Sequence, residues 1–261
     1  MLDFIKLSAT GNDFIVIDNM DLVYSAENKA LWKKLCERRK NIGADGILLV
    51  EPSEKYDFRM RYINSDGGEV GMCGNGGRAI SSFYYSNINQ SSKSLIFETM
   101  NGIYKSEICE NKSVKIEMTE LSDINKIDIN SLYSNKHSLY LNTGVPHCVY
   151  NVSDVKSVDV KSVGKNIREN KLFENGTNIN FFSVLKENKI VVRTYERGVE
   201  DETLSCGTGI TAVAIACRSF FKWGSKIDVS TKGGNLSVEF NRNDIFLIGD
   251  VDEIFKGSCS I

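Results

Sequence analysis

The sequence has little of what marks metal, nucleic-acid or membrane proteins. It contains only two histidines, His137 and His147, and no Cys-x-x-Cys pair, so no zinc or other metal site is expected. The 32 basic and 34 acidic residues give a formal net charge of −2, which offers no electrostatic case for a nucleic-acid partner or an anionic membrane.

Long apolar runs are also missing. None approaches the roughly 20 residues that span a bilayer, and the first residues lack the basic and apolar regions of a signal peptide. We therefore expect a cytoplasmic protein with no membrane partner.

Cysteines are present, but their number and spacing do not suggest a disulfide framework. There are seven, an odd number, widely spaced and without an export signal. Five are expected to be buried small hydrophobic residues: Cys36, Cys109, Cys148, Cys217 and Cys259. The other two, Cys73 and Cys206, differ because each belongs to a repeated motif.

The chain repeats its landmarks at a single offset of 133 residues. Without any gap, Thr10-Gly11 aligns with Thr143-Gly144, Gly43 with Gly176, Tyr62 with Tyr195, Cys73-Gly-Asn-Gly76 with Cys206-Gly-Thr-Gly209, and Ala79 with Ala212. One offset that holds over so long a stretch indicates an internal duplication.

The hydrophobic pattern repeats with the landmarks. Helices are expected over about 28–39, 75–86, 155–168 and 210–221, with strands between them and polar loops over 64–72 and 196–205. This predicts an α+β fold of two pseudo-two-fold related, strand-rich domains, each wrapped around a central helix, with the active site in the cleft between them. The predicted domains are 1–120, carrying Cys73, and 121–261, carrying Cys206, whose last residues can return to the first half.

Each repeated cysteine stands at the predicted start of a helix and is followed by Gly-x-Gly. A helix N-terminus carries partial positive charge and unpaired N–H groups, which lower the pKa of a thiol and attract an anion. The glycines let a carboxylate approach those N–H groups. Two such thiols facing each other suit inversion at a carbon, because one can remove a proton from one face while the other returns a proton to the opposite face.

Two other interpretations of the motif are weaker. Both copies fit a relaxed Gly-x-Gly-x-x-Ala dinucleotide fingerprint, but each follows a polar loop rather than the buried strand that the fingerprint requires. A purely structural role for both cysteines is also disfavoured, because starting a helix does not require Cys.

Several motifs spread over nearly the whole chain resemble those of the diaminopimelate epimerase family. They are Thr10-Gly-Asn-Asp-Phe14, Gly43-Ala-Asp-Gly46, Tyr62-Ile-Asn-Ser-Asp66, Met72-Cys-Gly-Asn-Gly-Gly-Arg78, Thr177-Asn-Ile-Asn-Phe181, Tyr195-Glu-Arg-Gly198 and Ser205-Cys-Gly-Thr-Gly209. The resemblance implies a homodimer without a cofactor, independent of pyridoxal phosphate, that interconverts LL- and meso-diaminopimelate in lysine and peptidoglycan synthesis.

The resemblance also implies roles for particular residues. Cys73 and Cys206 would be the acid/base pair, and the backbone N–H groups of Gly74, Asn75, Gly207 and Thr208 would hold the reacting carboxylate. The implied substrate-binding side chains are Asn12, Asn64, Asn178, Glu196 and Arg197, and His147 would line the site and bias the proton of a thiol. Glu196 and Arg197 would suit the distal groups of a small diamino-diacid substrate.

Two departures from the family pattern leave alternatives open. Gly144-Val-Pro-His147 replaces the usual Gly-Asn-Pro-His, so that Val145 stands at the position equivalent to Asn12, and the loop Gly198–Thr203 is one residue longer than usual, with an extra acidic group that could face solvent or the amino end of the substrate. A sister two-thiol racemase acting on another amino acid, such as histidine or proline, and a non-catalytic small-molecule binding protein therefore remain as rival hypotheses.

Overall fold

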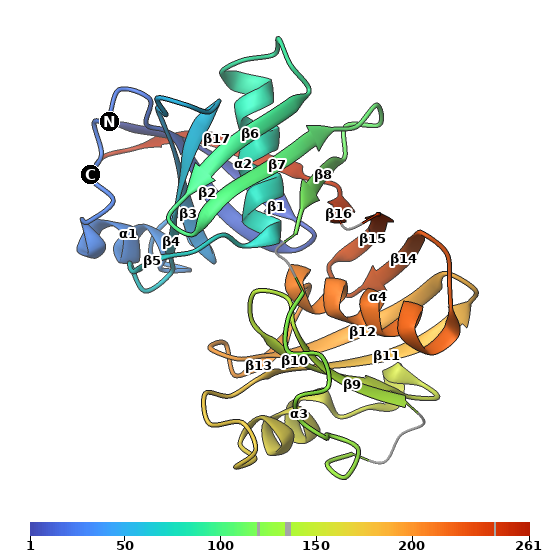
Figure 1. Ribbon diagram of the computed structural model, residues 1–261. Coiled ribbons are helices and arrows are strands. Elements are labelled where there is room, and N and C mark those ends of the chain that lie inside the picture. The colour runs from blue at the N-terminus through green and yellow to red at the C-terminus, as the bar shows by residue number, and fades with distance from the viewer. Residues whose placement is uncertain (119–120, 134–136, 243) are drawn as a thin grey trace. The chain divides into compact units, whose positions relative to one another are not determined.

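The computed structural model describes residues 1–118, 121–133, 137–242 and 244–261. They form two compact units (Figure 1). The first contains Met1–Glu117 together with Gly249–Ile261, and the second contains Met118–Ile248. In the described part of the chain, no helix is both long and apolar enough to cross a membrane.

The first unit has nine strands and two helices among its described residues. In chain order they are β1 (Leu2–Ala9), β2 (Asn12–Asp18), α1 (Lys29–Cys36), β3 (Gly46–Glu51), β4 (Phe58–Asn64), β5 (Glu69–Val70), α2 (Gly74–Asn87), β6 (Ser94–Thr99), β7 (Gly102–Ile108), β8 (Val114–Glu117) and β17 (Asp252–Cys259). The strands pair in the order β17, β1, β2, β3, β4, β6, β7, β8, and β5 adds to β4. The β2–β3 and β4–β6 pairs are parallel and the others antiparallel.

The core of the first unit lies on both faces of the β2–β3 pair. Every residue of β3 is buried, as expected for a strand covered on both sides. On one face, Trp32 and Leu35 of α1 pack with alternate residues of β2 and β3. On the other, α2 contacts β1, β2, β3, β7 and β8, and Figure 1 shows it among these strands. The start of α2 is thereby held in the interior of the unit.

The second unit repeats this order. Its elements are β9 (His137–Asn142), β10 (Pro146–Asn151), the 3₁₀ helix η1 (Val155–Ser157), α3 (Val160–Arg168), β11 (Asn178–Lys186), β12 (Lys189–Glu196), β13 (Asp201–Thr203), α4 (Gly207–Phe221), β14 (Lys226–Thr231), β15 (Gly234–Asn241) and β16 (Asp244–Gly249). The strands β9, β10, β11, β12, β14 and β15 pair in this order with the same alternation of antiparallel and parallel pairs, and β13 adds to β12. The helix α4 contacts β9 to β12 and β15.

The predicted α+β class is confirmed, with strands gathered around one central helix in each unit. The two central helices begin at Gly74 and Gly207, which are equivalent in the sequence repeat. The helix predicted over 155–168 is wrong in its first turn, which is the separate 3₁₀ helix Val155–Ser157. The predicted loops 64–72 and 196–205 each contain a short strand, β5 and β13.

The largest difference from the sequence prediction is β17, where no strand was expected. It pairs antiparallel with β1 from Leu2 opposite Cys259 to Ser8 opposite Asp252, which places the end of the chain in the first unit. Most of its side chains are exposed, so its sequence carries no clear alternation of buried and exposed residues. The predicted domain boundary after residue 120 falls beside residues 119 and 120, which lie outside the described residues; the units divide between Glu117 and Met118.

Candidate active site

Cys73 is the N-cap residue of α2. Its backbone is extended, with φ −115° and ψ 131°, and its carbonyl oxygen accepts the N–H of Gly77 at 2.7 Å. Its side chain makes no capping hydrogen bond, so the thiol is not committed to closing the helix. A Cβ on Gly77 would lie 2.2 Å from Cδ1 of Ile116, so a larger residue here would require the end of the Ile116 side chain to move. Bare backbone N–H groups therefore stand beside the thiol in the first turn.

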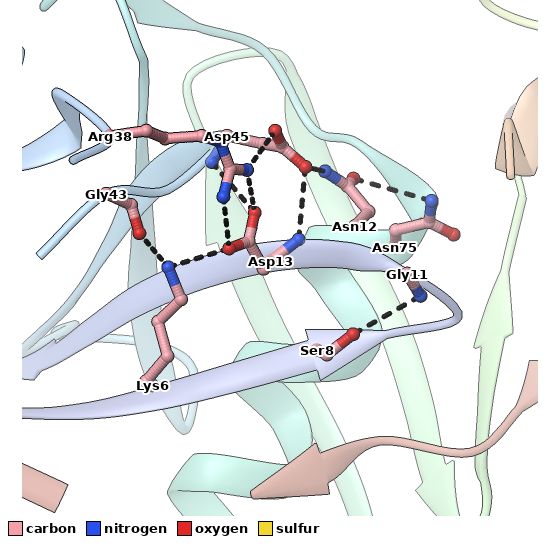
Figure 2. A network of polar contacts seen from close by, with 9 residues as sticks. All are labelled: Lys6, Ser8, Gly11, Asn12, Asp13, Arg38, Gly43, Asp45 and Asn75. Atoms are coloured by element: carbon pink, nitrogen blue, oxygen red, sulfur yellow. Dashed lines mark hydrogen bonds and ion pairs between the residues drawn. The ribbon is translucent and has the colours of Figure 1, made fainter. Parts of the chain in front are cut away.

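Asn12 and Asn75 lie beside this thiol. Asn12, the first residue of β2, directs its Oδ1 toward Sγ of Cys73 at 3.9 Å. The same oxygen lies 3.4 Å from Nδ2 of Asn75, a contact drawn in Figure 2. Its Nδ2 donates to Oδ2 of Asp45 at 2.8 Å. Three of the residues predicted for the site are thus brought together, and Asp45, which was not predicted, joins them.

Asp13 holds the other end of the same polar network (Figure 2). Its carboxylate contacts Nζ of Lys6 at 2.7 Å and both terminal nitrogens of Arg38. Burial acts to raise the pKa of Asp13, but hydrogen bonds from Arg38 and Lys6 outweigh it and lower the pKa to about 2. Lys6, only 5% exposed, also donates to the carbonyl oxygen of Gly43. The network is therefore a charged anchor under the β1–β2 turn that carries Asn12.

Arg78, in the second turn of α2, is fully buried. Its Nη2 donates to Oγ1 of Thr10 at 2.5 Å, and its Nε and Nη1 have no hydrogen-bond partner in the part of the chain that the structure describes. Burial lowers the pKa of Arg78 to about 10, an effect that the nearby Cys73 and Asp250 oppose. The guanidinium therefore remains cationic at neutral pH. The sequence signal was a charged residue within a helix start that is otherwise uncharged and rich in glycine.

Asn64, the last residue of β4, begins a tight turn in the first unit. Its backbone N–H donates to Gly68 and its carbonyl accepts the N–H of Gly67. Gly67 has φ +86°, and a Cβ there would lie 2.3 Å from the carbonyl oxygen of Lys29. The turn thus depends on glycine, and the contact of Asn64 with substrate stays a prediction.

Cys206 takes the equivalent place in the second unit, at the N-cap of α4. It is 6% exposed, its backbone has φ −120° and ψ 109°, and its carbonyl accepts the N–H of Ile210 at 2.9 Å. Its Sγ lies 3.5 Å from Oγ1 of Thr208. Thr143 donates from Oγ1 to the carbonyl of Thr208 at 3.0 Å, which ties the β9–β10 connection to the helix start.

His147 is buried beneath this helix start. Its Nδ1 lies 3.0 Å from Nδ2 of Asn180, and a Cβ on Gly209 would lie 2.3 Å from Oδ1 of the same asparagine. Burial, with a smaller contribution from the charge of Arg197, lowers the pKa of His147 to about 3. The ring is therefore neutral at neutral pH. Its predicted effect on the proton of a thiol stays a prediction.

Asn178, Glu196 and Arg197 gather at one end of the sheet in the second unit. Asn178 accepts the backbone N–H of Arg197 at 2.9 Å and donates to the carbonyl of Pro146 at 3.1 Å. Arg197 donates from Nη1 to the carbonyl of Asn175 at 2.8 Å. Asn178 thus joins β10 to the end of β12, where Glu196 is the last residue.

The acidic residues of the longer loop are paired within the second unit. Glu200 contacts Arg168 at 3.2 Å, Asp201 contacts Lys161 at 2.5 Å, and Glu202 contacts Arg193 at 2.6 Å. These ion pairs tie the loop to α3 and to β12. They give each acid a role in holding the loop, and a contact of this loop with the amino end of the substrate stays a prediction.

The remaining cysteines contrast with these two. Burial raises the pKa of the Cys36 and Cys148 thiols to about 12, and it raises that of Cys217 as well. Cys109 and Cys259 are only half-buried, so the prediction that these two are buried is wrong. Among the described residues, no group of three or more His, Cys, Asp and Glu side chains could hold a metal ion.

Comparison with known proteins places the two half-sites in a family. The family model described as diaminopimelate epimerase matches residues 4–123 and 139–253, which includes both helix starts. The chain belongs to the diaminopimelate epimerase family. Relatives in this family include the diaminopimelate epimerase of Flavobacterium psychrophilum, 41% identical with 96% of this chain and 97% of the relative covered. That of Chlorobaculum tepidum is 39% identical, with 98% and 100% covered.

More distant solved structures share the fold of the diaminopimelate epimerase family. A Bacillus anthracis phenazine biosynthesis protein of the PhzF family matches with a TM-score of 0.75 at 17% identity, covering 100% of this chain and 99% of the other. A hydroxyproline epimerase from Agrobacterium vitis, bound to trans-4-hydroxy-L-proline, matches with a TM-score of 0.63 at 10% identity, covering 98% and 91%. At these identities the likeness concerns the fold alone.

Proposed function

We propose that this member of the diaminopimelate epimerase family interconverts LL- and meso-diaminopimelate by passing protons between one α-carbon and the thiols of Cys73 and Cys206. The observation that carries the proposal is the doubled half-site. In each unit a cysteine caps the central helix with an extended backbone and without a side-chain capping bond. Full-length relatives named diaminopimelate epimerase, at 41% and 39% identity, support the substrate.

The proposed chemistry uses one thiol on each face of the α-carbon. One, as thiolate, removes the α-proton from one face of the carbon and becomes a thiol. The other, as thiol, gives its proton to the opposite face and becomes a thiolate, so charge and protons balance and the configuration inverts. The reverse reaction begins from the exchanged protonation states. No other co-reactant enters this proton balance.

Backbone N–H groups would stabilise the transition state. Removing the α-proton moves negative charge onto the carboxylate, and the first-turn N–H groups at Gly74, Asn75, Gly207 and Thr208 are suited to bind it. Asn75 is 1% exposed and Gly207 is buried, so a charge held there would meet little water. In such surroundings an oriented N–H group acts more strongly than in solution.

Side chains would recognise the distal half of the substrate. Glu196 suits the distal ammonium and Arg197 the distal carboxylate, since each offers the complementary charge at one end of the sheet. Asn12, Asn64 and Asn178 offer amides for the remaining polar groups. Requiring both distal groups would exclude ordinary amino acids. A homodimer and a cytoplasmic location remain part of the proposal.

The main rival is a two-thiol racemase acting on a different amino acid. It rests on Val145, which has no amide to offer where the family pattern has asparagine. Family membership and the full-length relatives favour diaminopimelate over this rival. A binding protein without catalysis is disfavoured because the cysteine is kept at both helix starts.

Incubation with LL-diaminopimelate in D₂O under reducing conditions tests the proposal. The expected result is meso product carrying deuterium at the inverted α-carbon. Exchange with histidine or proline but not with diaminopimelate would favour the rival racemase, and no exchange with any of them would favour a binding protein. As controls, Cys73→Ala and Cys206→Ala should each abolish epimerisation while the far-UV circular dichroism stays unchanged.

A further inference from the structure

The side-chain amide of Asn12 has a determined orientation. Its nitrogen lies 2.8 Å from Oδ2 of Asp45, and an ionised carboxylate can only accept hydrogen bonds. The atom facing Asp45 must therefore be the NH₂ group. The amide oxygen is then left facing Sγ of Cys73 at 3.9 Å. It also faces Nδ2 of Asn75 at 3.4 Å, as Figure 2 shows.

Asp45 is itself held in place from several sides. Its Oδ1 contacts Nη2 of Arg38 at 2.8 Å, and its Oδ2 also accepts the backbone N–H of Asp13 at 3.2 Å. Its own backbone N–H donates to the carbonyl of Asp13 at 3.0 Å. Arg38 in turn is fixed by Asp13. These contacts favour the orientation of the carboxylate toward Asn12, although its side chain is 43% exposed.

We propose that Asp45 is a positioning residue that fixes the amide of Asn12 with its oxygen, rather than its NH₂ group, toward the sulfur of Cys73. An oxygen in this place can accept the proton of the thiol but repels a thiolate. The contact therefore favours the acid form of Cys73. Without Asp45 the amide could turn over and donate an N–H to the sulfur, which would favour the thiolate instead.

The other groups around Cys73 act on the same thiol. Arg78 and the N-terminus of α2 favour the thiolate, and the negative charge of Asp250 acts on Arg78. None of these groups is linked to Asn12 by a hydrogen bond that Asp45 controls. They therefore stay constant when Asp45 is changed, and the effect of the amide can be measured as a difference.

The second unit supplies an internal control. The residue equivalent to Asn12 is Val145, which has no amide, and the hydroxyl of Thr208 lies 3.5 Å from Sγ of Cys206. A hydroxyl can donate or accept and can turn to suit either form of the sulfur. A change at Asp45 should therefore act on Cys73 and leave Cys206 unaffected.

The test measures the alkylation rate of each cysteine against pH with iodoacetamide, without substrate, followed by peptide mass spectrometry. In Asp45→Leu the midpoint for Cys73 is expected to fall by about 0.5–1 pH unit, while that of Cys206 stays unchanged. Removing the negative charge of Asp45 could by itself lower the Cys73 midpoint, even if the amide of Asn12 played no part. Asp45→Leu is therefore repeated in an Asn12→Ala background, where the shift is expected to vanish.

No selective shift at Cys73, or an equal shift with and without Asn12, would overturn the proposal. If Asp45→Leu fails to fold, Asp45→Asn takes its place. The Cys73 midpoint is then expected to fall by a smaller amount, and an unchanged midpoint would count equally against the proposal. The orientation of Asn12 and its effect on Cys73 do not depend on the proposed function. Only the importance of that effect for catalysis rests on it. Turnover of diaminopimelate without the shift would refute this inference alone, and the shift without turnover would refute the proposed function alone.

Discussion

Asn180 presents its side-chain NH₂ group to Nδ1 of His147 at 3.0 Å, and both side chains are fully buried. The orientation of this amide is set by the carbonyl oxygen of Cys148, which can only accept and lies 3.1 Å from Nδ2 of Asn180; the hydroxyl of Thr194 then donates to Oδ1 at 2.9 Å. Nδ1 must therefore act as an acceptor. In a neutral ring this places the proton on Nε2.

His147 is predicted to stay neutral, as the Nε2–H tautomer, throughout the working pH range. Two-dimensional ¹⁵N-imidazole NMR between pH 5 and 9 should show one unchanging set of signals for His147, assigned by their loss in His147→Gln. Because burial lowers the pKa to about 3, the unfolded chain takes up a proton below pH 6.5 that the folded ring does not. This residue's contribution to stability therefore falls as the pH drops from 6.5 toward 3. A His147 signal that titrates near pH 6.5 would contradict the account.

Asp13→Asn is predicted to destabilise the first unit by about 3 kcal/mol at pH 7, because it leaves the buried ammonium of Lys6 without its carboxylate. Urea unfolding measures the loss. The double variant Asp13→Asn/Lys6→Met should recover most of the lost stability. Since the pKa of Asp13 is lowered to about 2, its contribution is complete above pH 4 and is lost as the pH falls through 2. Equal stabilities of wild type and Asp13→Asn would show that the network is dispensable.

Arg78→Met is predicted to raise the pH midpoint for alkylation of Cys73, because it removes a buried cation that favours the thiolate. Arg78→Lys keeps the charge and should restore part of the effect. Cys206 should be unaffected, since the residue equivalent to Arg78 in the repeat is Thr211, whose hydroxyl donates to the carbonyl of Gly207. A fall in the Cys73 midpoint, or a matching change at Cys206, would show that Arg78 does not act on this thiol by its charge.

Val145→Asn is predicted to lower KM for diaminopimelate by about 2- to 10-fold, the range expected for one added hydrogen bond. Val145 is half-buried and its carbonyl oxygen accepts the N–H of Thr143 at 3.2 Å, so the substitution leaves the backbone of the turn in place. Val145→Leu, which adds no polar group, is the matched control and should not lower KM. An unchanged KM in Val145→Asn would mean that another group already occupies that contact.

The sequence was sufficient to predict the two half-sites because the repeat aligns Cys73 with Cys206, and both helices do begin one residue later. It did not reveal the residues that support them. Asp45 acts through Asn12 and Asn180 acts through His147, and each partner lies 33 residues away along the chain. Such pairings arise only when strands come together. The strand β17 was missed because its exposed residues carry no pattern and its stability comes from pairing with β1.

The central claim is that Cys73 and Cys206 reach the same substrate carbon, and a disulfide between them tests this most directly. After mild oxidation without substrate, peptide mapping should find the two cysteines joined in one cross-linked peptide, with activity lost in proportion and restored by reductant. Bound diaminopimelate should protect against it. Recovery of both cysteines in separate peptides, with full activity kept after oxidation, would contradict the account.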